Sequence, residues 1–257
     1  MAIGAFKSSP FKSIYKREPT PDLKRIELTL IYSVRLTILI NNPASINNIT
    51  LELKKNQNYT KIPQIITKEK IINPPWTSLY KINTELNIRP KENTPPHIYK
   101  NLLKNILEDQ SEFQELYTDA SKSDKGVGLA IIKNNSQTSF KLPSTCSIYT
   151  AEALAILLAI KHINKNVNQK YFILSDSLSA IISVKNKFNP SDLAIQIQNK
   201  LVEANQKNNN IIIIWIPGHI GIIGNEKADK QAKLAIGSMN SQFINIASYS
   251  DVRKQIR

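Results

Sequence analysis

In the second half of the chain, apolar positions recur in alternating blocks, some with the period of a strand and others with the period of a helix. The strand-like blocks are short and lie at residues 113–118, 126–132, 137–142, 171–174 and 211–216. The helix-like blocks are longer and lie at residues 147–163, 177–184, 191–205 and 222–236. The last strand block is apolar throughout, which is typical of a strand covered on both faces. This order of elements predicts an α/β fold in which helices flank a five-stranded mixed sheet.

Turn and capping residues mark the limits of several blocks. Asn134-Asn135 suits a hairpin between the second and third strands. Pro190 and Ser191 favour a helix start, and Gly237 favours a helix end. The sequence therefore predicts where these elements begin and end.

The first half of the chain has a different pattern. Residues 20–40 predict one amphipathic helix, which Thr20 can cap. Six of the thirteen prolines lie between Pro63 and Pro96, where they favour extended backbone over helix. We therefore expect a helical segment at 1–54 and a loosely structured linker at 55–112. The globular domain would follow at 113–237, with a tail at 238–257.

Composition narrows the class of protein. The formal net charge of +14 favours a polyanionic partner such as nucleic acid. Cys146 is the single cysteine, which excludes an internal disulfide and makes a zinc site improbable. Residues 28–40, a largely apolar stretch, contain Arg35 and are too short to span a bilayer. We expect a soluble monomer inside the cell, in the nucleus or the cytoplasm, without a membrane partner.

Carboxylates follow two of the predicted strands and lie on two of the predicted helices. Asp119 comes just after the first strand and Asp176 ends the fourth, so parallel pairing would bring them to one edge of the sheet. Glu152 shares a helix face with apolar residues, where an unpaired carboxylate is costly. Asp229 lies on the last helix, one turn after Glu226.

Four acids at one place would repel one another unless cations bind between them. Oxygen ligands suit Mg²⁺ or Mn²⁺, and two such ions can activate water and stabilise the leaving oxygen of a phosphodiester. Taken alone, Asp119 or Asp176 could simply cap a turn or a helix. The four together favour a metal site, and His219, ten residues before Asp229, could move protons beside it.

Six short motifs, in five blocks, resemble type 1 ribonuclease H in order and in spacing. They are YTDAS at 117–121, GVGLA at 126–130, TAEALA at 150–155, LSDS at 174–177, and WIPGH at 215–219 followed by GNEKAD at 224–229. The resemblance covers about residues 113–237. It implies a ribonuclease H-like fold and an endoribonuclease that cuts the RNA strand of RNA–DNA hybrids, leaving 5′-phosphate ends.

The resemblance also implies a role for each site residue. Asp119 would bridge two Mg²⁺ ions, with Glu152 and Asp176 at the leaving-group ion and Asp229 at the water-activating ion. Glu152 would also contact a ribose 2′-hydroxyl, which distinguishes RNA from DNA. His219 matches the family's catalytic histidine, and Glu226 matches an acid that lies near the metal ions without binding them directly.

One departure from the family concerns the grip on the hybrid. Residues 177–205 lack the tryptophan-rich basic handle with which some members bind the hybrid, and Lys185 and Lys187 replace it only in part.

The flanking segments carry a second resemblance. Segments 4–10 and 18–35, and the tail from Tyr249, resemble those around the nuclease in insect-type non-LTR retrotransposon polyproteins. The resemblance therefore implies a reverse transcriptase module as a partner in a parent polyprotein.

Two other functions fit the same sequence. One is a non-catalytic nucleic-acid-binding or assembly module, which the N-terminal 112 residues suggest. The other is an integrase-like DNA-strand transferase on the same fold. The fourth acid and the placement of His219 argue against the transferase.

Overall fold

The computed structural model describes residues 63–72, 74, 76–77, 80–134, 136–239 and 241–254. All of these lie in one compact unit, Ile62–Arg257. The helix expected at 20–40, and the whole segment expected at 1–54, lie outside the described residues.

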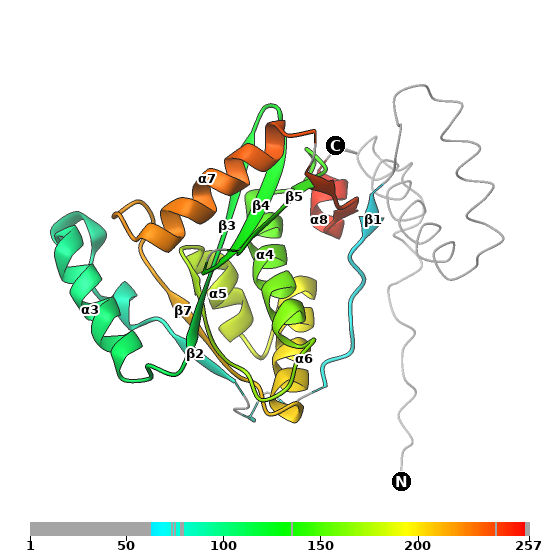
Figure 1. Cartoon of the computed structure of the whole chain (residues 1–257). Helices are drawn as coiled ribbons and strands as arrows, with labels where there is room; N and C mark the ends of the chain where they lie inside the picture. The colour runs from blue at the N-terminus through cyan, green and yellow to red at the C-terminus, as the bar shows by residue number, and fades with distance from the viewer. Residues whose placement is uncertain are drawn as a thin grey trace, which may run out of the picture. The chain divides into compact units, whose positions relative to one another are not determined.

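A mixed sheet of seven strands forms the centre of the unit, in the order β2-β7-β6-β3-β4-β5-β8 (Figure 1). Its five inner strands correspond to the five predicted ones: β3 (Gln114–Ser123), β4 (Gly126–Lys133), β5 (Ser136–Leu142), β6 (Lys170–Ser175) and β7 (Asn210–Trp215). β3 pairs antiparallel with β4 and parallel with β6, and β7 runs parallel to β6. The predicted α/β fold with a mixed sheet is confirmed. Short edge strands from the two flanks, β2 (Lys81–Asn83) and β8 (Gln242–Phe243), extend the sheet.

Helices cover both faces of the sheet (Figure 1). On one face lie α4 (Ile148–Ile163), α5 (Leu178–Lys185) and α6 (Asp192–Gln206), and on the other lies α7 (Ile223–Gly237). α4 and α6 begin at Ser147 and Ser191, whose hydroxyls accept hydrogen bonds from backbone N–H groups three residues later. Gly237 is the last residue of α7, and extended Ser238 caps the helix, so the predicted glycine stop is off by one residue.

α4 is the most enclosed helix of the fold. Eleven of its sixteen residues are buried, because it packs against the sheet on one side and α6 on the other. Its apolar residues therefore extend around most of the helix. The carboxylate of Glu152 is enclosed with them, at 7% exposure.

The expectation of a loosely structured linker at 55–112 is wrong for residues 80–110. This stretch forms β2, the short helices η2 (Glu85–Ile88) and η3 (Lys91–Asn93), and helix α3 (Pro96–Glu108). Tyr99 and Leu103 of α3 are buried, and the Tyr99 hydroxyl donates to the carbonyl of Arg89 at 2.7 Å. Pro90 and Pro96 stand at helix starts, where a missing N–H group costs nothing. The prolines mark where these helices begin and do not disrupt them.

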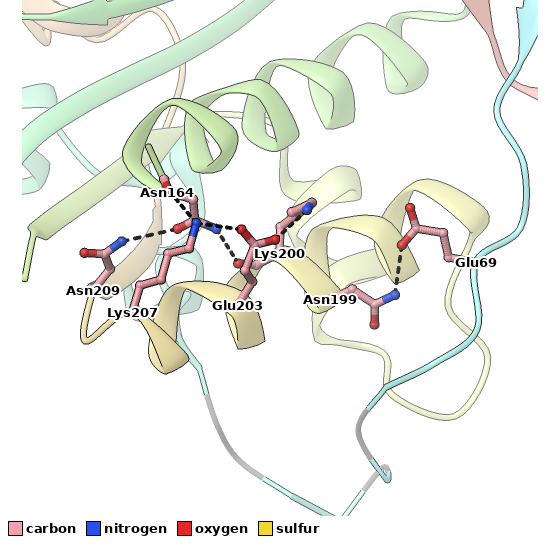
Figure 2. A network of polar contacts seen from close by, with 7 residues as sticks. All are labelled: Glu69, Asn164, Asn199, Lys200, Glu203, Lys207 and Asn209. Atoms are coloured by element: carbon pink, nitrogen blue, oxygen red, sulfur yellow. Dashed lines mark hydrogen bonds and ion pairs between the residues drawn. The ribbon is translucent and has the colours of Figure 1, made fainter. Parts of the chain in front are cut away.

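The two flanks of the unit meet in a small second sheet. β1 (Gln64–Ile65) pairs in parallel with β9 (Ile246–Ala247). Residues 67–72 lie against α6. There the Asn199 side chain donates a hydrogen bond to Glu69 at 2.9 Å (Figure 2) and accepts one from the Ile72 amide. The tail contains α8 (Tyr249–Arg253), and its Asp251 accepts a hydrogen bond from the Ser147 amide at 3.0 Å. The tail is thus attached to the start of α4.

A polar network closes the end of the unit at which β6 and β7 begin (Figure 2). Lys207 donates to the Asn164 carbonyl at 2.7 Å and pairs with Glu203 at 3.0 Å. Asn164 donates to the Lys200 carbonyl at 2.9 Å, and Asn209 lies 3.4 Å from the Asn164 side-chain oxygen. These bonds join α4, α6 and the start of β7 at this end.

Cys146 lies in the core of the unit. The Cys146 thiol is fully buried and donates to the Ile246 carbonyl at 3.2 Å, and burial raises its pKa to about 12. Among the described helices, none is long and apolar enough to cross a membrane.

Candidate active site

Three of the four predicted acids meet where β6 ends. Asp119 lies in β3, Glu152 in the second turn of α4, and Asp176 just after β6. One carboxylate oxygen of each lies within 4.8 Å of one from both others. Asp119 and Glu152 are only 4% and 7% exposed. Three acids from distant parts of the chain therefore lie together, with Asp119 and Glu152 buried and Asp176 half-buried.

The strand register explains how the two aspartates come together. The parallel pairing of β3 with β6 ends at Thr118 and Ser175, so Asp119 and Asp176 are the next residues on neighbouring strands. β3 itself continues to Ser123, because its antiparallel pairing with β4 does not stop there. The prediction that Asp119 follows the strand is therefore wrong, since Asp119 lies within β3 where β6 diverges from it.

Asp176 is held by two donors, one at the end of β7 and one at the start of α7. The Trp215 indole donates to its backbone carbonyl at 3.1 Å, and the Asn225 side chain donates to Oδ2 at 3.2 Å. Asn225 is buried, in the first turn of α7. Sequence reasoning gave it no role, although it stands next to Glu226 in the motif at 224–229. An amide within the motif at 224–229, between Gly224 and Glu226, is the sequence signal that points to it.

Glu152 has an oxygen with no hydrogen-bond partner. Among the described residues, nothing donates to its Oε2, which has almost no solvent contact. An unpaired buried carboxylate oxygen is costly unless a ligand completes it. The residues present therefore fit a hard cation, because the cluster offers only oxygen donors and one of them lacks a partner.

The three pKa values are all raised. Burial, followed by repulsion from Asp176, raises the pKa of Asp119 to about 8. Burial and repulsion from Asp119 and Asp176 raise the pKa of Glu152 well above its usual range. Burial also raises the pKa of Asp176, against the hydrogen bond from Asn225 and the nearby charge of His219. Charge in this space is unfavourable at neutral pH, and a bound cation would relieve it.

A second group lies beside the first. His219, Glu226 and Asp229 each offer a ligand atom, and these atoms also lie within 4.8 Å of one another. Asp229 raises the pKa values of Asp119 and Asp176, so it lies within their electrostatic reach. Its carboxylate also pairs with Lys233 at 2.7 Å. The structure thus places Asp229 next to the three acids, in the group of His219 and Glu226.

A small residue in β4 lets α7 approach the sheet. A side chain at Gly128 would collide with the backbone carbonyl of Ala232 in α7. The missing Cβ therefore allows helix and strand to touch. This close approach brings Asp229, one turn before Ala232, to the end of the sheet where Asp119 lies.

Lys185 and Lys187, predicted as a thin basic handle, have partners in the preceding segment. Lys185 donates to the Thr84 hydroxyl at 3.3 Å. Lys187 donates to the Thr77 carbonyl, and its ammonium lies 5.7 Å from the centre of the Tyr80 ring. Phe188, in the same loop, is 87% exposed. The two lysines connect α5 and its following loop to residues 77–84.

Comparison with known proteins assigns part of the folded unit to a family. Residues 111–237 match the model of the RNase H family. A Pol polyprotein of caprine arthritis encephalitis virus (strain Cork) is 28% identical over 127 residues, which are 49% of this chain and 11% of that protein. A Pol polyprotein of equine infectious anemia virus (strain Wyoming) is 24% identical over 201 residues, 75% of this chain and 14% of that protein. The chain spans a small part of these relatives, and residues 111–237 of it form a domain of the RNase H family.

Proposed function

We propose that this protein is a divalent-metal-dependent endonuclease that hydrolyses the RNA strand of RNA–DNA hybrids. The observation that carries the proposal is the cluster of Asp119, Glu152 and Asp176, in which the first two are buried and Glu152 Oε2 has no hydrogen-bond partner among the described residues. Three neighbouring carboxylates repel one another and so destabilise the fold by themselves. Binding of a cation would offset this repulsion, which is why we connect the cluster with a cation-dependent activity.

The donor set favours Mg²⁺, with Mn²⁺ as a substitute. Asp119, Glu152 and Asp176 would hold one ion, and Asp229 with Asp119 would hold a second. Bound there, the two ions would activate water and stabilise charge on the leaving oxygen. The overall change adds water across one P–O3′ bond, which leaves a 5′-phosphate and a 3′-hydroxyl.

The chain's own residues orient the ligands and move protons. Asn225 and Trp215 fix Asp176 through its side chain and its backbone. His219 is exposed beside Glu226 and Asp229, where its imidazole would transfer protons during the reaction. The net charge of +14 favours association with the phosphates of a hybrid.

The origin, partners and location of the protein belong to the same proposal. Both relatives are Pol polyproteins. We propose that this chain likewise comes from a retrotransposon polyprotein with a reverse transcriptase module. It would act as a monomer on nucleic acid, in the nucleus or the cytoplasm.

The decisive experiment is cleavage of a hybrid whose RNA strand is labelled, with and without Mg²⁺. Asp119→Asn should lower the rate by about 10³-fold or more, because losing one ligand removes several kcal/mol of transition-state stabilisation. Asp124→Asn is the matched control, since Asp124 is exposed in the turn after β3. Equal cleavage by wild type and Asp119→Asn would disprove the site.

Two further outcomes would favour the other candidate functions. Tight hybrid binding without cleavage, at a Mg²⁺ concentration that supports a known nuclease, would indicate a binding module. Cutting or joining of DNA strands, with the RNA left intact, would indicate a strand transferase.

A further inference from the structure

The loop that joins β7 to α7 carries His219 in an unfavourable backbone conformation. Residues 216–222 form this loop, which we call the histidine loop. His219 has φ 57°, a left-handed value that residues other than glycine rarely adopt, and Gly221 has φ 77°. Such conformations persist only where surrounding contacts hold them.

Two lysines from the segment before the domain contact this loop. The Lys91 ammonium donates to the Gly218 carbonyl at 2.8 Å. The Lys100 ammonium lies against Gly221, so that a side-chain Cβ there would come within 2.8 Å of it. The residues on both sides of His219 are thus in contact with ammonium groups from another part of the chain.

The loop also touches the acids directly. Gly218 packs against the Asp176 carboxylate so closely that a Cβ would collide with Oδ2. The Gly221 amide donates to Glu226 at 3.2 Å. A movement of the histidine loop would therefore change the surroundings of both acidic groups.

The segment that supplies the lysines is firmly attached to the sheet. Residues 81–108, here called the brace, contain β2, η2, η3 and α3. β2 pairs in parallel with β7, the strand that leads into the histidine loop. Leu86, Tyr99 and Leu103 of the brace are buried. The backbone that carries the two lysines is therefore held in place by pairing and packing.

We propose that Lys91 and Lys100 are positioning residues of the nuclease. The brace holds the histidine loop, and with it His219, in the conformation that faces the acids. This inference rests on the proposed function, and it assigns to residues outside 111–237 a part in the reaction.

Cleavage kinetics with the full chain provide the first test. Lys91→Met removes the donor but keeps the length of the side chain. We expect about a tenfold lower kcat, a KM within about twofold of wild type, and recovery in Lys91→Arg. Lys100→Met should act in the same direction. Lys104→Met is the matched control, since Lys104 lies on α3 and pairs with Glu108 at 3.5 Å.

A double variant tests whether Lys91 acts through His219. Lys91→Met combined with His219→Ala should be no slower than His219→Ala alone. A further loss of the same size in the double variant would overturn the proposal. So would a raised KM with unchanged kcat and a weaker salt dependence, which would show that Lys91 binds a phosphate.

Hydrogen exchange provides a measurement that does not depend on activity. In Lys91→Met the amides of the histidine loop should exchange faster, while those of α6 stay unchanged. If the wild-type protein cleaves nothing, the proposed function fails, and the exchange result still decides whether the brace holds the loop. Unchanged exchange in Lys91→Met would overturn the inference even in an active nuclease.

Discussion

The two ends of the central sheet differ in how their carboxylates are paired. Where β6 and β7 begin, Glu203 lies between Lys200 and Lys207, and hydrogen bonds from these lysines lower its pKa. Where β6 ends, Asp119, Glu152 and Asp176 face one another, and burial raises the pKa of each. One end is complete as folded. The other holds carboxylates that repel one another, as we propose for a site that binds a cation.

The largest expected effect of a substitution at the acidic end is on cleavage. Glu152→Gln should reduce the cleavage rate by about 10²–10³-fold, because an amide is a weaker ligand than a carboxylate. Without a divalent ion, at a pH high enough to ionise these carboxylates, the same variant should unfold at a higher temperature than wild type, because one repelling charge is gone. Rates and melting temperatures of the same preparations measure both. A variant that loses both activity and stability would contradict the contrast between the two ends.

The next effect is a dependence of stability on pH. The pKa of Asp119 is about 8 when folded, against an ordinary value of 3.8, so the unfolded chain loses this proton first. Without divalent ions, stability should therefore fall as pH rises from about 4 towards about 8. Mg²⁺ at a hundred times its Kd should restore about 2.7 kcal/mol near pH 8.

Melting curves at several pH values, with EDTA or with Mg²⁺, check this. Asp119→Asn should flatten the slope seen in EDTA. A wild-type slope of the opposite sign in the same pH range would mean that these acids are not the buried charges that matter.

At the other end, loss of a buried partner should lower stability without affecting chemistry. Asn164 is 5% exposed and bonds to the Lys200 carbonyl. Asn164→Ala should cost about 1–3 kcal/mol, since buried groups lose their partner. Chemical denaturation measures this cost. Cleavage at a temperature where the variant is folded should equal that of wild type, and a slower rate would show that the two ends are coupled.

The smallest expected effect is from the salt bridges of the same network. Glu203 pairs with lysines whose side chains are about one third exposed, and such pairs contribute little. Glu203→Gln should change the free energy of unfolding by less than about 1 kcal/mol and leave cleavage unchanged. A loss as large as that of Asn164→Ala would mean that the network acts as one unit.

Sequence reasoning succeeded where the signal is periodic. Strands with alternating or unbroken apolar residues, and the carboxylate of Glu152 on an apolar helix face, could be located because burial leaves a pattern in the sequence. The meeting of Asp119 with Asp176 followed from parallel pairing alone. Pairing partners of the short strand β2 could not be predicted, because three residues carry too little pattern.

The structure of the brace could not be predicted either, because its local sequence is misleading and its contacts are with distant residues. Its prolines favour extended backbone by sequence alone, yet Pro90 and Pro96 stand at the starts of helices. Contacts such as that of Lys91 with Gly218 join residues 127 positions apart. No local property of a lysine indicates a distant carbonyl, so only the folded chain shows this contact.

The pairing of β2 with β7 has a consequence for where this domain can be divided. The family match begins at residue 111, after β2 and α3 have ended. A shorter protein that starts there would leave the apolar run Ile211–Ile214 with unpaired backbone groups along a sheet edge. Such an edge invites strands from other molecules to add to it, so the shorter protein would tend to self-associate unless a substitute strand covered it.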